Sequence, residues 1–368
     1  MTADTVGGVW TYALELTAAL APFGVEVTLA TMGGPLSADQ RAAAARLDNL
    51  AIRESRYRLE WMEAPWGDVR DAGTWLVALE AEVRPDLVHL NGYAHGALDW
   101  RAPVLVVGHS CVLSWFAAVR GEVPYEQWRR YRRAVARGLR RADFVVAPTA
   151  AMRDALRTHY GSFGRSGVVY NGRRAGDFPP REKEPFVLCA GRLWDAAKNV
   201  RALQAVAPAL SWPVCVAGAE RHPEGGTVRL ENVKLLGRLA PSALARWMGH
   251  ASIYALPARY EPFGLTALEA GLAGCALVLG DIPSLREVWG DAALFVPPDD
   301  HAALAGALQR LIDDRALRRR MRRRARERAL AFTPDRMARR YLDVYAALLG
   351  RSEAASTDVF TARVGNGG

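Results

Sequence analysis

Short apolar runs alternate with segments of helical periodicity along most of the chain. The apolar runs lie at 25–31, 86–90, 104–107, 144–147, 168–170, 186–190, 214–217, 233–236, 252–256, 276–279 and 294–296. Segments with the apolar spacing of a helix separate them, for example 10–20, 74–83, 127–139 and 241–248. Nearly continuous apolar strands joined by helices are typical of parallel sheets covered on both faces. The pattern therefore predicts an α/β protein with two doubly wound domains.

The predicted domain boundary falls in a polar stretch near the middle of the chain. Residues 171–185, NGRRAGDFPPREKEP, are rich in proline and show no apolar period. We place one domain at 1–174 and the second at 175–333. A last helical segment covers 334–350, and the small polar residues 351–368 are predicted to form a disordered tail.

The N-terminus carries a glycine-rich turn that opens a helix, DTVGGVW at 4–10. Such turns normally follow a strand that positions them, yet only Met1, Thr2 and Ala3 precede Asp4. We therefore expect the first strand of this domain to be missing, or the true start to lie upstream. On this interpretation, an upstream extension of about ten residues, an apolar run of one ordinary strand length, should increase stability and activity.

The composition indicates a globular protein. Of 368 residues, 50% are hydrophobic and 24% are charged, which excludes a mainly disordered or collagen-like chain. Uncharged runs at 102–119 and 202–219 contain polar residues and prolines, and we interpret each as a strand joined to part of a helix rather than a membrane span. The first ten residues have no secretory signal, and four scattered cysteines lie in apolar stretches. These features favour a cytoplasmic protein with reduced thiols.

The net charge of +9 favours anionic partners such as nucleotide phosphates, acidic lipid headgroups or nucleic acid. The segment 127–141, QWRRYRRAVARGLRR, places Trp128, Tyr131, Val135 and Leu139 on one helical face among seven arginines. A basic amphipathic helix of this kind can lie on an anionic membrane. The alternative is that the apolar stripe packs on the sheet and the arginines are solvated.

The most specific motif, YEPFGLTALEA at 260–270, follows the apolar run 252–256. Pro262 fixes a turn, Gly264 allows close backbone approach, and a helix then starts near Leu265 with unpaired amides that attract anions. Glu261 precedes this helix and Glu269 lies about one turn inside it. Two carboxylates beside an amide cluster suit a ligand with both hydroxyls and phosphates. The alternative is that both are surface acids, which helix starts favour anyway.

A second motif, CAGRLWDAAKN at 189–199, has the form of a strand, a glycine turn and a helix. Arg192 and Lys198 lie in the loop at the carboxyl end of the strand, where open α/β sheets bind ligands. Both cations suit phosphate oxygens. A solvated loop cation is the alternative for Arg192, whereas Lys198 is one of only three lysines.

Together these motifs resemble the retaining, GT-B-fold glycosyltransferases of glycosyltransferase family 4, over roughly residues 4–349. The matching segments, in order, are TVGGVWTYALEL, YNG at 170–172, GRLWDAAKN, LLGR at 235–238, EPFGLTALE and the closing segment 280–298. The resemblance implies two Rossmann-like domains facing across a cleft. It also implies that the final helix, 334–350, crosses back to the N-terminal domain.

The resemblance assigns the nucleotide-sugar donor to the second domain. Glu269 would hold the ribose hydroxyls, and Glu261 would contact the transferred sugar. Arg192 and Lys198 would bind the diphosphate and neutralise leaving-group charge. The same comparison adds five further residues to the donor site: Arg238, Phe263, Gly264, and the amides of Leu265 and Thr266.

In the first domain, the resemblance places a catalytic histidine after a central strand, which corresponds to His109 after 104–107. A lone histidine is otherwise more often structural. Gly7 and Gly8 would form a loop on the acceptor side. The family usually needs no metal, and no other cofactor is implied.

The sequence therefore predicts a retaining transfer of a sugar from a nucleotide-diphosphate sugar to a sugar or lipid-linked acceptor. Cell-surface polysaccharide or glycolipid synthesis is the expected setting, in the cytoplasm or at the inner face of the membrane. The alternatives are a sugar-nucleotide epimerase, a pyridoxal-phosphate phosphorylase and a catalytically impaired scaffold. A nucleic-acid partner is not expected, because no interleaved basic and aromatic platform is visible.

Overall fold

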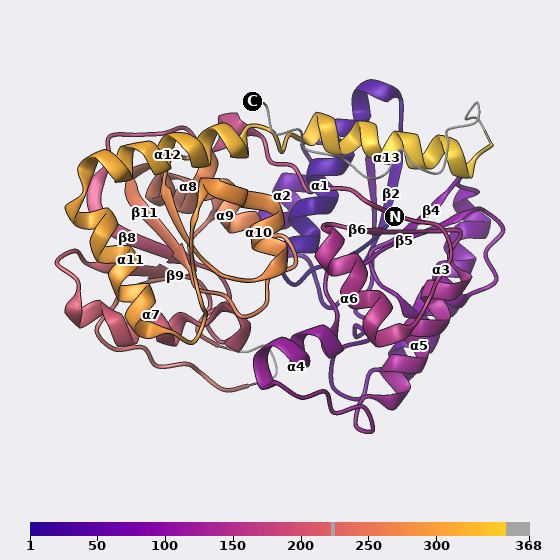
Figure 1. The fold of residues 1–368 in the computed structure, drawn as a ribbon. Coiled ribbons are helices and arrows are strands. Elements are labelled where there is room, and N and C mark those ends of the chain that lie inside the picture. The colour runs from indigo at the N-terminus through magenta and orange to yellow at the C-terminus, as the bar shows by residue number, and fades with distance from the viewer. Residues whose placement is uncertain (222–224, 351–368) are drawn as a thin grey trace. The chain divides into compact units, whose positions relative to one another are not determined.

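The computed structural model describes residues 1–221 and 225–350 (Figure 1). The predicted tail, 351–368, lies outside the described residues. The chain divides into two compact units. Unit 1 contains Met1–Ser114, Val123–Gly172 and the C-terminal segment from Pro334, and unit 2 contains Trp115–Glu122 and Arg173–Thr333. None of the helices in the described ranges has the length and apolar character needed to cross a membrane.

Unit 2 is built on a parallel sheet of six strands in the order β10-β9-β8-β11-β12-β13. The strands are β8 (Glu184–Ala190), β9 (Val214–Ala217), β10 (Lys234–Gly237), β11 (Ala251–Leu256), β12 (Ala276–Gly280) and β13 (Leu294–Val296). The strand order reverses between β8 and β11, which pair in parallel. In open α/β sheets, the carboxyl ends of the strands at such a reversal form a ligand-binding crevice.

Helices cover the sheet of unit 2 because its strands are apolar on both faces. They are α7 (Val200–Val206), α8 (Pro241–His250), α9 (Leu265–Leu272), α10 (Pro283–Trp289), α11 (His301–Asp313) and α12 (Arg315–Ala329), with the 3-10 turn η4 (Ala196–Lys198) after β8. One core contains buried Val187 and Ile253 from the sheet with Leu203, Leu308 and Met321 from the helices. Burial on both faces holds the loops at the strand ends in fixed positions.

Unit 1 contains two parallel sheets. Strands β1 (Thr2–Asp4), β2 (Val27–Met32) and β3 (Leu50–Glu54) form one, and β4 (Val88–Leu90), β5 (Val104–Val107), β6 (Phe144–Ala147) and β7 (Ser166–Val168) form the other. Asn91, directly after β4, links the two sheets. Its main-chain N–H donates to Thr2 Oγ1 at 2.9 Å, and its Nδ2 donates to the Thr2 carbonyl at 2.7 Å.

The expectation that the first strand is missing is wrong. Three residues form β1, and Thr2, Ala3 and Asp4 pair in register with Ala30, Thr31 and Met32 of β2. So short a strand keeps its place because a ladder holds one side and the Asn91 side chain holds the other. The glycine turn at Gly7 therefore does follow a strand. Asp4 Oδ1 also accepts from the Val6 N–H at 3.1 Å and fixes the start of that turn.

The helices of unit 1 are α1 (Gly8–Leu20), α2 (Ala38–Ala44), α3 (Trp66–Val83), α5 (Arg129–Arg141), α6 (Ala150–Tyr160) and α13 (Pro334–Leu348). A short helix, α4 (Val112–Arg120), is divided between the units. The last helix, α13, buries Met337, Tyr341 and Val344 in one core with residues of α1. This i, i+4, i+7 spacing is that of an amphipathic helix with its apolar face in the core.

Within the segment 127–141, residues Arg129–Arg141 form α5, and the half-buried Trp128 precedes its first turn. Tyr131, Val135 and Leu139 are buried, with 3%, 0% and 1% of their surface exposed. A side chain at Gly138 would place its Cβ 1.8 Å from the Tyr93 carbonyl oxygen, so only glycine lets the neighbouring turn pack against α5. The apolar stripe thus packs inside unit 1, and the arginines remain exposed.

Candidate active site

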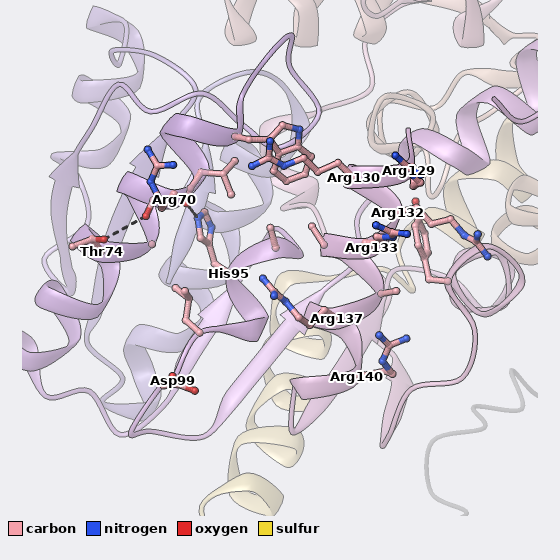
Figure 2. A pocket seen from close by; sticks show the side chains of 18 of the residues that line it. Arg70, Thr74, His95, Asp99, Arg129, Arg130, Arg132, Arg133, Arg137 and Arg140 are labelled. Atoms are coloured by element: carbon pink, nitrogen blue, oxygen red, sulfur yellow. Dashed lines mark hydrogen bonds between the residues drawn. The ribbon is translucent and has the colours of Figure 1, made fainter. Parts of the chain in front are cut away.

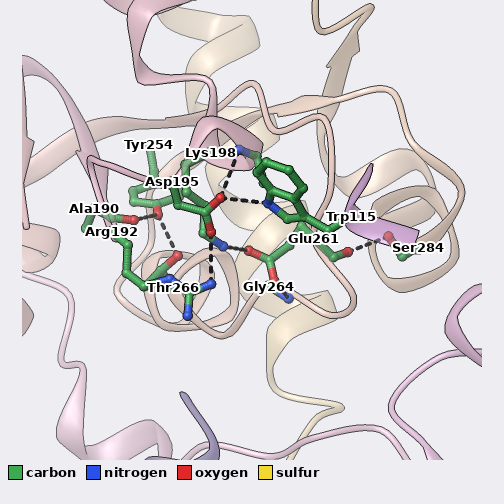
Figure 3. Close-up of polar contacts among 11 residues, drawn as sticks. Trp115, Ala190, Arg192, Asp195, Lys198, Tyr254, Glu261, Gly264, Thr266 and Ser284 are labelled. Carbon is green, nitrogen blue, oxygen red and sulfur yellow. Dashed lines mark hydrogen bonds and ion pairs between the residues drawn. The ribbon is translucent and has the colours of Figure 1, made fainter. Parts of the chain in front are cut away.

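An ion pair between Lys198 and Glu261 joins the two motifs at the carboxyl ends of β8 and β11 in unit 2 (Figure 3). Lys198 ends the turn η4 after β8, and Glu261 lies in the loop after β11. Both side chains are largely buried, with 15% and 11% of their surface exposed. The structure thus brings together two residues that the sequence analysis had found in separate motifs.

The loop around Glu261 is held by local hydrogen bonds. Glu261 Oε1 accepts from the Gly264 N–H at 3.1 Å, and its main-chain oxygen accepts from the Ser284 hydroxyl. Gly264 has φ +91°, a left-handed conformation that favours glycine. It also caps α9, so the carboxylate and the first amides of that helix lie in one short segment.

The loop that carries Lys198 is fixed by Asn199 and by close backbone packing. Asn199 Nδ2 donates to the carbonyls of Pro257 and Pro298, at 3.0 and 2.6 Å. A Cβ on Gly218 would lie 1.7 Å from the Gly191 carbonyl oxygen, so glycine is required where the two loops touch. Lys198 is therefore presented from a rigid support.

Arg192 is the more exposed of the two predicted cations, with 44% of its side chain accessible. Its guanidinium lies 2.9 Å from Asp195 Oδ2 and 5.4 Å from the centre of the Trp194 ring. Asp195 Oδ1 also accepts from Trp115 Nε1 at 2.9 Å and from the Ala197 N–H at 3.0 Å. Sequence reasoning did not select Asp195, although an aspartate ahead of a helical turn is a capping signal.

Asp195 is held as a carboxylate. Burial would raise its pKa, but Arg192, Trp115 and Lys198 outweigh that effect and lower the pKa below its usual range. The resulting charge holds Arg192 in the loop after β8 and leaves much of its side chain accessible.

The start of α9 presents main-chain donors beside Glu261 of the Lys198–Glu261 pair. Its first amides, which include those of Leu265 and Thr266, lack partners within the helix, as at every helix N-terminus. The Thr266 hydroxyl lies 2.7 Å from the Tyr254 hydroxyl, which in turn lies 3.1 Å from the Ala190 carbonyl. Phe263 is buried and packs edge to face on Phe332, with ring centres 5.8 Å apart, so it supports the loop from inside.

Glu269, one turn into α9, is buried and pairs with Arg173. Arg173 Nε and Glu269 Oε1 are 3.0 Å apart, and only 12% and 10% of the two side chains are exposed. Arg173 belongs to the polar segment 171–185 that is predicted as the domain boundary, and its spacing in the sequence does not indicate a functional role. Arg238 follows β10, is exposed, and makes no ion pair with another described residue.

His109 of unit 1 follows β5 and contacts the side chains of Asn91 and Tyr12. Its Nε2 lies 2.8 Å from Asn91 Oδ1, and its ring packs edge to face on Tyr12 with centres 4.4 Å apart. Burial lowers the pKa of His109 to about 3, so the ring is neutral near pH 7.

Gly7 and Gly8 are exposed, and Gly7 adopts φ +113° where it caps α1.

In chemical terms, the loops at the carboxyl ends of β8 and β11 combine two cations, the amide end of α9 and two buried carboxylates. Cations and amides suit phosphate oxygens, and carboxylates accept hydrogen bonds from hydroxyls. The same unit has the strand order and switch point of nucleotide-binding sheets.

Comparison with known proteins identifies the family and the fold of the chain. The model of the family described as Glycosyltransferase Family 4 matches residues 6–174, and that described as Glycosyl transferases group 1 matches residues 175–328. The fold and the site define a GT-B protein of two α/β units. The chain belongs to the group 1 glycosyltransferases of the family 4 type, as its motifs indicate.

Three individual proteins illustrate the likeness. A glycogen synthase of Mycobacterium tuberculosis is 27% identical over 275 residues, which are 67% of this chain and 64% of that protein. The chain thus spans less than two thirds of that relative. A phosphatidyl-myo-inositol mannosyltransferase of Mycolicibacterium smegmatis is 26% identical over 94% of this chain and 92% of its own. HepE of Anabaena, solved with UDP-glucose, superposes with a TM-score of 0.75 at 16% identity, covering 94% of this chain and 98% of HepE.

Proposed function

We propose that this protein is a retaining glycosyltransferase that moves a sugar from a nucleotide-diphosphate sugar to an acceptor hydroxyl. The observation that carries the proposal is the Lys198–Glu261 ion pair at the switch point of unit 2, beside the amide end of α9. A diphosphate and a sugar need cations, amides and a carboxylate at adjacent positions, and the loops at the carboxyl ends of β8 and β11 supply all three.

Each site residue has a role in this proposal. Lys198 and Arg192 bind the diphosphate and stabilise the charge that develops when the bond between the anomeric carbon and the phosphate oxygen breaks. The amides of Leu265 and Thr266 bind the same oxygens. Lys198 exchanges Glu261 for a phosphate oxygen, which frees the carboxylate for the sugar hydroxyls.

Two further residues complete the assignment. Glu269 binds the ribose hydroxyls of the nucleotide, and the pairing with Arg173 orients its carboxylate. His109 of unit 1 acts on the transferred sugar as a neutral ring or through its main-chain oxygen. Gly7 and Gly8 form the loop on the acceptor side.

The relatives guide the choice of substrates. The glycogen synthase points to a polysaccharide acceptor and the mannosyltransferase to a lipid-linked one. HepE was solved with UDP-glucose, so UDP-glucose is the first donor to test. We place the reaction in cell-surface polysaccharide or glycolipid synthesis on the cytoplasmic side of the membrane.

The test is a panel of UDP-, GDP- and ADP-sugars, with release of nucleoside diphosphate and transfer to sugar acceptors as readouts. We expect one donor to be turned over, and Glu261→Ala to lower its turnover with little change in nucleotide affinity. Nucleotide binding without turnover of any donor would instead indicate a scaffold. Conversion of the donor without release of nucleoside diphosphate would indicate an epimerase.

Peripheral contact with an anionic membrane through residues 127–141 is the second part of the proposal. It is supported by the net charge of +9 and by the exposed arginines of α5. Binding to anionic vesicles should weaken with salt, because charges are screened within about 8 Å at physiological ionic strength. Equal binding to neutral and anionic vesicles would contradict it.

A further inference from the structure

A groove on unit 1 lies outside the transfer site described above. It has a volume of about 1380 Å³ and is lined by residues of α3, α5 and the segment around His95 (Figure 2). All its lining residues belong to unit 1. The volume exceeds the range of roughly 300 to 1,000 Å³ that is usual for small-molecule sites.

The charge of the groove is strongly positive. It is lined by seven arginines and two carboxylates, namely Arg70, Arg129, Arg130, Arg132, Arg133, Arg137 and Arg140 against Asp99 and Glu126. Asp99 already pairs with Arg141, at 2.9 Å. Figure 2 shows the arginines of α5 along one wall and Arg70 of α3 on the other.

Four of these arginines form a stripe that the fold itself does not require. Arg129, Arg133, Arg137 and Arg140 recur along one face of α5, and none makes an ion pair with another residue in the described ranges. Like charges four residues apart destabilise a helix. Arg129 is also in the first turn, where a positive charge opposes the helix dipole. The stripe therefore reduces the stability of α5 unless an anion covers it.

Two other arginines are already held in place by the walls. The guanidinium of Arg130 lies 4.9 Å from the centre of the Trp66 ring, and that of Arg132 lies 5.0 Å from the Tyr125 ring. Arg132 Nε also donates to the His159 carbonyl at 3.2 Å. Stacking on an aromatic ring leaves the edge of a guanidinium available for an anion.

We propose that this groove is a binding site for a molecule that carries several phosphate groups. Arginine binds phosphate through two parallel hydrogen bonds, and a phosphate monoester carries up to about two negative charges. Several phosphates can therefore balance the excess of arginines within one groove, whereas carboxylates bring a single charge each. The proposal does not depend on the transfer reaction assigned to unit 2.

The packing of α5 favours a phosphate-bearing ligand over insertion into a bilayer. A helix that enters a membrane interface presents an apolar face to the lipid. Tyr131, Val135 and Leu139, which form that face of α5, are buried inside unit 1. The phosphates could belong to a soluble molecule or to a lipid headgroup, and both offer the same chemistry to the arginines.

The test is calorimetric binding of inorganic tripolyphosphate to the full chain. We expect Arg133→Gln combined with Arg137→Gln to weaken one binding event at least tenfold. The matched control, Arg319→Gln with Arg320→Gln, removes the same charge from exposed positions of α12 and should leave that event unchanged. Equal affinity of the two double variants would overturn the proposal, because the binding would then reflect net charge alone.

Because tripolyphosphate can also occupy the donor site, Lys198→Ala is measured in parallel. If the binding event assigned to the groove persists in Lys198→Ala, the groove site is independent of the donor site in the proposed function. Loss of all tripolyphosphate binding in Lys198→Ala would overturn the groove site. A second double variant, Arg129→Gln with Arg140→Gln, confirms that the effect comes from the stripe, and melting temperatures check the fold of every variant.

A vesicle arm identifies the source of the phosphates. Phosphatidylcholine vesicles with and without a phosphoinositide are compared, and tripolyphosphate is added as competitor. A lipid headgroup is supported if tripolyphosphate releases the protein from phosphoinositide vesicles and if the variant at Arg133 and Arg137 loses this competable binding. Groove binding of tripolyphosphate without vesicle binding supports a soluble ligand. Vesicle binding that neither tripolyphosphate nor the variant affects, with no groove event in calorimetry, would overturn the site.

Discussion

The side chain of Asn91 determines which nitrogen of His109 carries the proton. Asn91 Nδ2 donates to the Thr2 carbonyl, so its Oδ1 is the atom that faces His109 Nε2 at 2.8 Å. An amide oxygen only accepts, and His109 Nε2 must therefore be the protonated nitrogen. Nδ1 is then the basic nitrogen of a neutral ring. The short strand β1 thus helps to set the protonation site of His109, the candidate catalytic residue, because Thr2 orients the Asn91 amide.

We expect Asn91→Ala to lower the turnover of sugar transfer by about tenfold or more, because the ring of His109 then loses its fixed tautomer and orientation. The affinity for nucleoside diphosphate should not change, since the groups assigned to it lie in unit 2. Steady-state kinetics and calorimetry measure the two effects separately.

Asn49→Ala is the matched control for Asn91→Ala. Asn49 is a buried asparagine of unit 1, and its Nδ2 donates to the carbonyls of Thr17 and Val25, both at 2.9 Å. Its loss should lower the melting temperature without a selective loss of turnover. If the two variants lose turnover in proportion to their stability, Asn91 has only a structural role.

The half-buried His109 should make unit 1 less stable at acidic pH. Its pKa is about 3 when folded, against about 6.5 for an exposed histidine, so the unfolded chain binds the proton more readily. The stability that the neutral ring contributes is complete above about pH 6.5 and is lost as the pH falls toward 3. At pH 5 the loss should reach about 2 kcal/mol from this group alone.

Urea unfolding of the wild type and of His109→Gln at pH 7.5 and pH 5 measures this effect. The glutamine variant should lose less stability over this interval than the wild type, because it cannot take up the proton. The same acid-induced loss in both proteins would show that His109 does not titrate on unfolding. Turnover between these two pH values should show no inflection from His109.

The strands of unit 2 were predictable because burial on both faces leaves a continuous apolar run. The expected run 252–256 falls within β11 (Ala251–Leu256), and 186–190 falls within β8 (Glu184–Ala190). In unit 1, β3 (Leu50–Glu54) was missed, because its exposed arginine and glutamate interrupt the apolar pattern. β1 was missed because three residues carry no periodicity, and only its ladder with β2 reveals it.

The residue types of the donor site were visible in the motifs, but their contacts were not. Lys198 and Glu261 are 63 positions apart and meet because β8 and β11 are neighbouring strands. The strand order of this sheet cannot be read directly from the sequence. Arg173 and Asn91 were missed for the same reason. Each acts through a partner that is distant in the chain, and neither lies in a recognisable motif.

We expect Lys198→Ala to weaken the binding of nucleoside diphosphate by roughly thirtyfold. The change removes a charge-assisted hydrogen bond to phosphate worth about 2 kcal/mol. Lys234→Ala is the control, because Lys234 is exposed at the start of β10, at the opposite end of that strand from Arg238, and its ammonium lies 5.7 Å from the centre of the Trp247 ring. Unchanged calorimetric affinity in Lys198→Ala would remove this residue from the proposed site.

The ion pair between Arg173 and Glu269 should couple the stability of unit 2 to nucleotide binding. Arg173→Ala leaves a buried carboxylate without its partner, which should cost about 3 kcal/mol or more in the free energy of unfolding. Glu269→Gln should be less damaging to stability but should weaken nucleotide affinity, because the amide accepts ribose hydroxyls less strongly than a carboxylate. Urea unfolding and calorimetry report the two quantities.

A double-mutant cycle completes this prediction. If the two residues interact mainly with each other, Arg173→Ala combined with Glu269→Gln should be more stable than the sum of the single losses predicts, by about 1 kcal/mol or more. Nucleotide affinity in the double variant should remain as low as in Glu269→Gln, because the carboxylate is still absent. Additive stability losses would mean that the pair contributes nothing beyond its separate contacts. Normal nucleotide affinity in Glu269→Gln would mean that another group holds the ribose.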